Sequence, residues 1–227
     1  RRLLDDFEDS ILSIRELAER QSGQVTLACI PTAAFYFLPS VIRDYNEQYP
    51  KIRIRLLDLS ANDGLEAVLR GEADFGINMM SGQHPDIEFV SLVQEHFVLA
   101  CRRDHPLANR ASVTWTELAD YRLIGVGRLS GNRMLLDHAL SGLSWRPQWF
   151  YEGQHLSTSL GMVEAGLGVS AMPSLAMPAA DHPTLVSVPL TDPVVNRTLG
   201  LVYRRGASLS PAAEKFVSIL LQKWPNR

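Results

Sequence analysis

Several features are scarce in this 227-residue sequence, and each scarcity excludes a class of protein. Only two residues are cysteines, too few for a small secreted scaffold held together by disulfides. No apolar run reaches the roughly 20 residues of a membrane-spanning helix. The net charge is −3, whereas a domain that grips nucleic acid is usually clearly basic. With 46% apolar and 21% charged residues, the composition predicts a folded globular chain rather than a disordered one.

The two cysteines indicate where the protein works. Cys29 and Cys101 lie within apolar runs typical of strands, which favours small buried thiols over a redox sensor. The first residues lack the apolar core of a signal peptide. Together these features indicate a cytoplasmic protein. Because the sequence starts at Arg1 and not at Met, we also expect a segment upstream of it.

Motifs for catalysis are scarce as well. The six histidines show no metal-ligand spacing, and neither a Gly-x-Ser-x-Gly nucleophile elbow nor a phosphate loop is present. The turn at Gly125–Gly127 resembles a dinucleotide turn, but the next glycine, Gly131, comes one position late for that fingerprint. We therefore expect no enzyme, no metal site and no cofactor.

An amphipathic helix is predicted at the start of the chain, over residues 1–22. Its apolar residues are spaced alternately by three and four, which is the seam of a coiled coil, and Gly23 is a plausible stop. The same stripe would suit a helix that docks on its own domain. We favour a dimerising linker helix whose seam consists of Leu4, Phe7, Ile11, Ile14 and Ala18.

The rest of the chain alternates predicted strands and helices, as in α/β proteins with parallel strands. A break at 102–106 is the first candidate hinge. The predicted strands span residues 25–30, 52–56, 74–77, 89–93, 96–101, 123–126, 149–151, 169–172, 186–190 and 198–203. The predicted helices span about 35–49 (after Pro31–Ala34), 60–71, 115–119, 132–140, 157–165 and 211–224, with Ser60 or Asn62 capping the second and Ser157 or Thr158 the fifth.

Polar residues follow several strands at the point where a helix begins, which is where ligands bind in open α/β sheets. Free backbone amides and hydroxyls at such places suit an anion. Each serine or threonine can equally be a plain helix cap, and the paired methionines can equally be core. Arg128 could pair with an anionic ligand, whereas Arg133 favours a surface ion pair or a solvated position. The candidates are Pro31, Thr32, Ala33, Met79, Met80, Arg128, Leu129, Ser130, His155 and Leu156.

Further motifs are spread over nearly the whole chain. They include Phe37–Ile42 with Tyr49-Pro50, Leu69–Ile77, Asp104–Ala108, and Val163–Val169 with Met172-Pro173. In this order and spacing, the chain resembles the effector-binding (regulatory) domain of LysR-type transcriptional regulators.

The resemblance implies an α/β, two-lobed, type 2 periplasmic-binding-protein-like fold behind the N-terminal linker helix. Residues 23–100 and 196–227 would form lobe I, and residues 101–195 lobe II. A small-molecule effector would bind between the lobes, and lobe I would add Ser60, Ala61 and Asn62 to the candidates. A homodimer or homotetramer would contact promoter DNA through an N-terminal winged helix-turn-helix that this sequence does not contain. No membrane is implied.

Two other functions share the two-lobed fold. A periplasmic solute-binding protein of a transporter would need an export signal and has no use for a dimerising helix. An enzyme on this fold would need convergent acid, base or nucleophilic side chains, and the sequence shows none.

Overall fold

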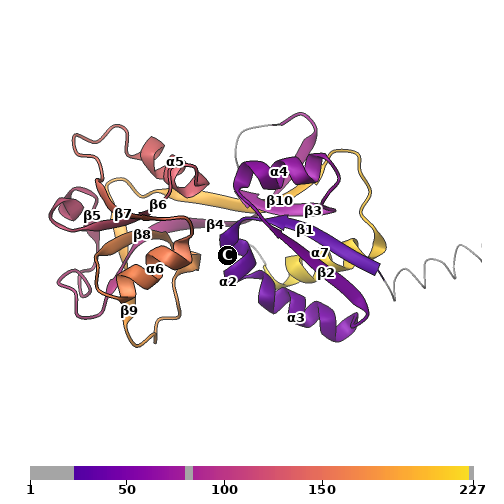
Figure 1. The fold of residues 1–227 in the computed structure, drawn as a ribbon, viewed down its shortest axis with the longest axis horizontal. Helices are drawn as coiled ribbons and strands as arrows, with labels where there is room; N and C mark the ends of the chain where they lie inside the picture. Colours follow the sequence, from indigo (N-terminus) through magenta and orange to yellow (C-terminus); the bar gives the residue numbers. More distant parts are fainter. Residues whose placement is uncertain (1–22, 80–83, 225–227) are drawn as a thin grey trace, which may run out of the picture. The chain divides into compact units, whose positions relative to one another are not determined.

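The computed structural model describes residues 23–79 and 84–224, which form two compact units. Unit 1 ends at Val93 and resumes at Leu199, and unit 2 is Gln94–Thr198. The strands β4 and β10 contain these crossings and so belong to both units (Figure 1). The expected lobe limits, after residue 100 and before residue 196, differ from these, and the chain leaves unit 1 before the predicted hinge at 102–106.

The two strands expected at 89–93 and 96–101 are in fact one. β4 runs from Ile87 to Arg102 without a break. The polar pair Gln94-Glu95 suggests a loop in the sequence, but Glu95 is buried and paired in the structure. A charged side chain that finds its partner inside the protein does not interrupt a strand.

Unit 1 is a sheet covered on both faces. β1 lies between the parallel strands β2 and β3, and β10 pairs antiparallel with β3. Figure 1 shows α4 on one face of this sheet and α3 and α7 on the other. Its elements are β1 (Gly23–Cys29), α2 (Pro31–Tyr36), α3 (Leu38–Gln48), β2 (Ile52–Asp58), α4 (Ala61–Leu69), β3 (Phe75–Met79) and α7 (Pro211–Lys223), with parts of β4 (Ile87–Arg102) and β10 (Asn196–Arg204).

The helix expected after Ala34 and up to Tyr49 begins earlier, at Pro31, and is divided into α2 and α3 at Phe37. Pro39 has no amide hydrogen to continue an α-helical ladder from the preceding turn, so it is tolerated only in the first turn of a new helix. The core below contains Tyr45, which is fully buried and donates its hydroxyl hydrogen to the Ala212 carbonyl at 3.0 Å. The Tyr45 ring lies 5.1 Å from that of Phe216 on α7.

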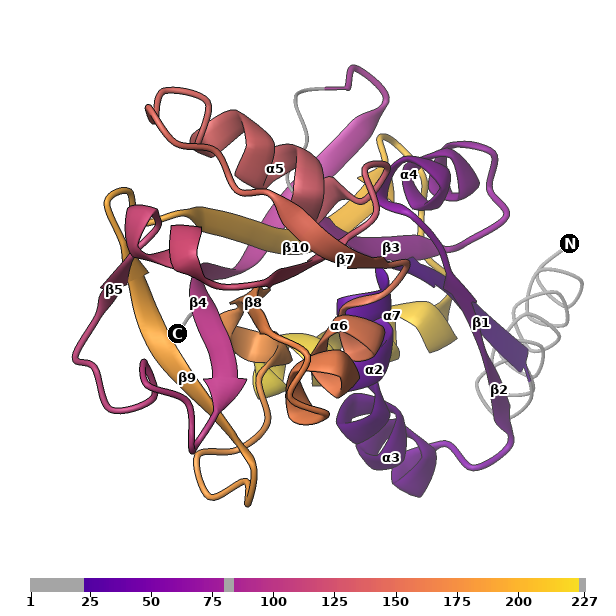
Figure 2. The same ribbon diagram turned by 60° about the vertical axis from the view of Figure 1, so that its left-hand side comes forward.

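Unit 2 is a second sheet with helices on both faces. β6 pairs parallel with β7 and with β8, while β4 pairs antiparallel with β8 and β9. α5 and α6 cover opposite faces (Figure 2). The further elements are β5 (Val113–Thr114), η1 (Thr116–Asp120), β6 (Leu123–Val126), α5 (Gly131–Ala139), β7 (Trp149–Gly153), α6 (Leu156–Glu164), β8 (Val169–Pro173), η2 (Ser174–Ala176) and β9 (Leu185–Thr191).

Glycine at 125 is explained by packing. A Cβ placed on Gly125 would lie 2.5 Å from Cε3 of Trp149 on the neighbouring strand, a contact too close for any side chain. Indeed, Gly125 lies within β6 and not in the turn that follows it. Gly125 therefore belongs to a close strand approach, whereas Gly127 follows β6.

Of the other local predictions, some are confirmed and some are wrong. Ser60 caps α4 as predicted, whereas α6 starts at Leu156 with His155 at the N-cap position, so neither Ser157 nor Thr158 is its cap. Gly23 begins β1. The predicted linker helix, with its seam from Leu4 to Ala18, lies outside the described residues. Among the helices that are described, none is long and apolar enough to cross a bilayer.

Candidate functional site

The candidate residues of unit 1 lie at one edge of its sheet. The last residue of β1, Cys29, is paired with Asp58 of β2 and Ile77 of β3, so the carboxyl ends of the three strands lie together. Backbone hydrogen bonds join the loops that follow, from Leu59 N to the Cys29 carbonyl and from Ile30 N to the Ile77 carbonyl. We call Pro31, Thr32, Ala33, Ser60, Ala61, Asn62 and Met79 the unit-1 cluster.

Thr32 is the member of this cluster with an unused polar group. Its side chain lies in the first turn of α2, which begins at Pro31 without a side-chain cap. Thr32 is only 3% exposed, and among residues 23–79 and 84–224 its hydroxyl has no hydrogen-bond partner. Ala33 beside it is fully buried. The hydroxyl oxygen keeps contact with solvent, so a ligand can replace that water, and Thr32 is the strongest ligand-contact candidate in unit 1.

The hydroxyl of Ser60 is already occupied. It accepts a hydrogen bond from the Asp63 amide at 3.2 Å and donates to Asp63 Oδ2 at 2.6 Å. This is a helix cap at the start of α4, with the Asp63 carboxylate favourably placed in the first turn. Asn62 is exposed beside it, and Ala61 is half-buried. Met79 is buried, and Met80 lies outside the described residues.

Asn78, which is not among the residues predicted from the sequence, holds this edge together. Its side chain is buried, donates through Nδ2 to the Ala61 carbonyl at 2.7 Å and accepts from the Met79 amide at 2.8 Å. These bonds fix the end of β3 against the start of α4. The available signal was an amide residue in the otherwise apolar strand Phe75–Met79, because a buried amide needs partners.

The candidates of unit 2 lie at the carboxyl ends of β6 and β7. The Gly127 amide donates to the Gly153 carbonyl at 2.9 Å, which brings the loops after the two strands together. We call Arg128, Leu129, Ser130, His155 and Leu156 the unit-2 cluster. Leu156 is buried, His155 is exposed, and Leu129 is 91% exposed.

The unit-2 cluster offers donors to a ligand. Arg128 is exposed and has no ion pair within the described part of the chain. α5 follows Ser130 and α6 follows His155, and neither helix start has a side-chain cap. Their first amides are therefore open to water or to an anion.

Arg133 forms ion pairs, as one of the two favoured alternatives had it, but its own side chain is buried and not at the surface. Its side chain is 8% exposed and pairs with Asp137 at 3.0 Å and Glu152 at 3.1 Å. The guanidinium also lies over the Trp149 ring at 4.9 Å and donates to the Val126 carbonyl. Arg133 therefore anchors α5 to β7 and is not available to a ligand.

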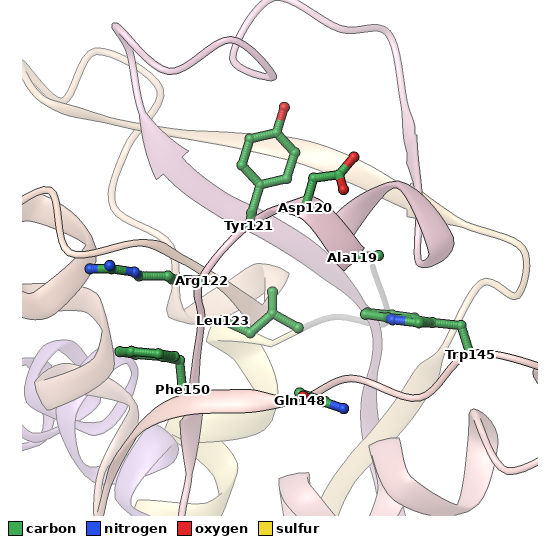
Figure 3. Close-up of a pocket in the computed structure, with 8 residues that line it drawn as sticks. All are labelled: Ala119, Asp120, Tyr121, Arg122, Leu123, Trp145, Gln148 and Phe150. Atoms are coloured by element: carbon green, nitrogen blue, oxygen red, sulfur yellow. The ribbon is translucent and has the colours of Figure 1, made fainter.

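A surface pocket of about 420 Å³ lies elsewhere in unit 2 (Figure 3). It borders the amino ends of β6 and β7, opposite the end that carries the unit-2 cluster. The Arg122 guanidinium lies 4.8 Å from the centre of the Phe150 ring. The pocket is thus separate from the candidate residues; it is lined by Ala119, Asp120, Tyr121, Arg122, Leu123, Trp145, Gln148 and Phe150.

Both cysteine thiols have low reactivity. Burial is the largest cause that raises the pKa of Cys29 to about 12, with a further contribution from Asp58, and burial raises that of Cys101 to about 11. Both thiols are therefore protonated near neutral pH and poor nucleophiles. In the described ranges, no three His, Cys, Asp or Glu side chains gather to hold a metal ion.

Sequence comparison assigns the chain to a family. The family described as "LysR substrate binding domain" matches residues 18–225. The uncharacterized HTH-type transcriptional regulator YbhD of Escherichia coli (strain K12) is 51% identical over 224 residues, which cover 99% of this chain and 71% of YbhD.

Solved structures share the fold. The effector-binding domain of QuiR in complex with shikimate superposes with a TM-score of 0.76 at 22% identity, covering 89% of this chain and 97% of that one. The regulatory domain of Synechocystis PCC6803 CcmR in complex with 2-PG gives a TM-score of 0.80 at 20% identity, covering 91% and 100%. The chain therefore has the periplasmic-binding-protein-like type 2 fold. It belongs to the LysR-type transcriptional regulators, as their effector-binding domain, and is not an enzyme.

Proposed function

We propose that this domain binds a small anionic effector through the unit-1 and unit-2 clusters and reports the binding to the rest of a DNA-binding regulator. The observation that carries the proposal is the Thr32 hydroxyl, which belongs to a residue only 3% exposed just after the carboxyl end of β1 and has no hydrogen-bond partner in the described chain. A ligand with a hydrogen-bonding oxygen would supply the missing partner.

The charge of the effector follows from the donors around it. The unit-2 cluster contributes the guanidinium of Arg128, which has no ion pair with any described residue, and the uncapped helix starts of α5 and α6, all of which favour negative charge. In both clusters, Met79, Leu129 and Leu156 would contribute apolar surface. Small carboxylates and phosphorylated metabolites combine these properties. The relatives named above support this class, since their structures were determined with shikimate and 2-PG.

The effector would act by shifting a conformational equilibrium. A ligand that binds one lobe arrangement better than another favours it by its difference in affinity, and a few kcal/mol are sufficient. We infer that residues 1–22 form the dimerising linker helix and that promoter DNA is bound by a winged helix-turn-helix outside this chain. A homodimer or homotetramer in the cytoplasm would then change the spacing of its DNA-binding domains.

Thermal-shift screening of small carboxylates, shikimate first, tests the ligand class, because a ligand of the folded state raises its melting temperature. Calorimetry with a confirmed ligand then compares two variants. Thr32→Val should weaken binding about tenfold through the loss of one hydrogen bond. Thr26→Val removes a hydroxyl from β1, the strand that precedes Thr32, away from its carboxyl end, and should leave affinity unchanged. Equal affinities in all three proteins would remove Thr32 from the site.

Assembly discriminates this function from solute transport. A transport receptor works as a monomer, whereas a linker-helix regulator is an oligomer. Gel filtration of the chain is expected to give at least a dimer, and a strict monomer at all concentrations would contradict the proposed dimerising helix. A thiol-based sensor is not favoured, because both cysteines are buried and their pKa values are raised.

A further inference from the structure

A buried ion pair joins β4 to β10 inside unit 2. Arg197 on β10 donates through Nε to Glu95 Oε1 at 2.8 Å, and its Nη2 lies 2.6 Å from the same oxygen. The side chains of Arg197 and Glu95 are 0% and 1% exposed. Burial lowers the pKa of Arg197, which the Glu95 carboxylate opposes. A buried pair of this kind persists only with good geometry and further hydrogen bonds.

Two further segments supply those hydrogen bonds. Arg197 Nη1 donates to Oδ1 of Asn132, in the first turn of α5, at 2.6 Å. The second oxygen of Glu95 accepts from the backbone amide of Leu175, in η2, at 2.8 Å. One network therefore connects β4, β10, α5 and η2, and each connection is a hydrogen bond with a charged partner, the stronger kind.

The role of this network follows from its position more than from its contribution to stability. β4 and β10 continue from unit 2 into unit 1, and the chain crosses just beyond Glu95 and Arg197, at Val93–Gln94 and Thr198–Leu199. At its other end the network holds Asn132, which is separated only by Gly131 from the loop of Arg128, Leu129 and Ser130. The candidate effector loop of unit 2 and the two crossing strands are thus linked by side chains.

We infer that Asn132 is a positioning residue that couples the unit-2 cluster to the crossing strands through Arg197 and Glu95. This inference rests on the proposed function in one respect: effector contact at residues 128–130 is the event that the network would transmit to the crossing strands. The coupling itself is a property of the ligand-free domain. A charged network of fixed geometry makes the loop, the start of α5 and the two strands move as one body.

The adjacent residue provides a matched control. Arg133 anchors the same turn of α5, but to Glu152 on β7 and to the Val126 carbonyl on β6. It makes no hydrogen bond or ion pair to β4 or β10 in the described residues. Loss of the Arg133 anchor should loosen α5 without disturbing the crossing strands, whereas loss of the Asn132 anchor should disturb both.

The Leu175 amide is the reporter, because it contacts Glu95 and lies on neither α5 nor a crossing strand. Amide hydrogen exchange, followed by NMR in the chain without any ligand, compares wild type with Asn132→Leu, Asn132→Asp and Arg133→Met. We expect Asn132→Leu, which keeps the side-chain size but removes the acceptor, to speed exchange at Leu175 about tenfold. Asn132→Asp restores an acceptor for Arg197 and should restore protection, while Arg133→Met should leave Leu175 unchanged.

Three outcomes would overturn the inference: no change at Leu175 in Asn132→Leu, no rescue by Asn132→Asp, or an equal change in Arg133→Met. Should the leucine variant fold poorly, Asn132→Ala makes the same prediction in a side chain that favours helix. The readout needs no effector. A thermal-shift screen without a hit would therefore count against the proposed anionic ligand but not against the coupling. An unchanged exchange rate at Leu175 would count against the coupling but not against the proposed ligand.

Discussion

The two units position their candidate residues by different means. In unit 1 the carboxyl edge of the sheet is held by neutral groups, chiefly the Asn78 amide and the Ser60 cap. In unit 2 the corresponding edge is held by ion pairs, the fully buried pair of Arg197 with Glu95 and the pair of Arg133 with Glu152, in which only Arg133 is buried. The contrast shows that the loops at the edge of such a sheet can be held in place either by neutral hydrogen bonds or by ion pairs. Unit 2 should therefore respond more strongly to single substitutions and to pH.

The largest effect is expected from Glu95→Gln. It leaves the Arg197 charge buried without a carboxylate, and breaking a buried pair in this way costs roughly 3–5 kcal/mol. Urea unfolding followed by circular dichroism measures it. Glu152→Gln, at the half-exposed partner of Arg133, is the matched control and should cost no more than about 1 kcal/mol. Similar losses in the two variants would contradict the distinct status of the Glu95–Arg197 pair.

A smaller loss is expected in unit 1 from Asn78→Ala. The Ala61 carbonyl and the Met79 amide would lose their partner, at a cost of about 1–3 kcal/mol. Asn62→Ala removes an exposed amide nearby and should change stability by less than about 0.5 kcal/mol. The same denaturation experiment checks both variants. If Asn78→Ala exceeded the Glu95→Gln loss, the proposed contrast between the units would be reversed.

Strands and helices could largely be predicted from apolar alternation, which a single sequence displays directly. The Ser60 cap was equally accessible, because capping residues are local. The Glu95–Arg197 pair could not be predicted from the sequence. Charged residues in a strand are usually exposed, and here the partners are separated by 102 positions, so only the fold brings them together. That hidden pair is also why one strand, β4, was predicted as two.

The same limit applies to the candidate site. Each loop that follows a strand could be identified, but not which polar groups were already occupied. Ser60 and Thr32 look alike in the sequence, yet one hydroxyl caps a helix and the other has no partner in the described chain.

The response to pH should be smaller again, and it belongs to unit 2. Burial lowers the pKa of His105 below its ordinary value of 6.5, although Asp104 opposes this. The unfolded chain then binds a proton more readily than the folded one, so stability from His105 is present above pH 6.5 and is lost as the pH falls through its folded pKa. Unfolding free energies of wild type and His105→Gln, compared between pH 7.5 and 5, should show that difference shrinking. A difference that grows toward acid pH would give the opposite sign and refute this.

The two units should differ least in their thiols, which are expected to react alike. Cys29 in unit 1 and Cys101 in unit 2 both have raised pKa values because they are buried. Alkylation by iodoacetamide at pH 8, followed by mass spectrometry, should be slower in the folded chain than in denaturant by more than about a hundredfold at both sites. Rapid labelling of either cysteine in the native protein would reopen a thiol-based function.

One measurement tests the central claim directly: the backbone amide spectrum of the domain, titrated with a carboxylate that raises its melting temperature. The account predicts that the largest shifts fall on Thr32 and Ala33 in unit 1 and on residues 128–132 and 156 in unit 2. Shifts confined to the pocket of Figure 3, at Ala119–Leu123 and the Trp145 indole, would show that the effector binds elsewhere and would contradict the proposed site.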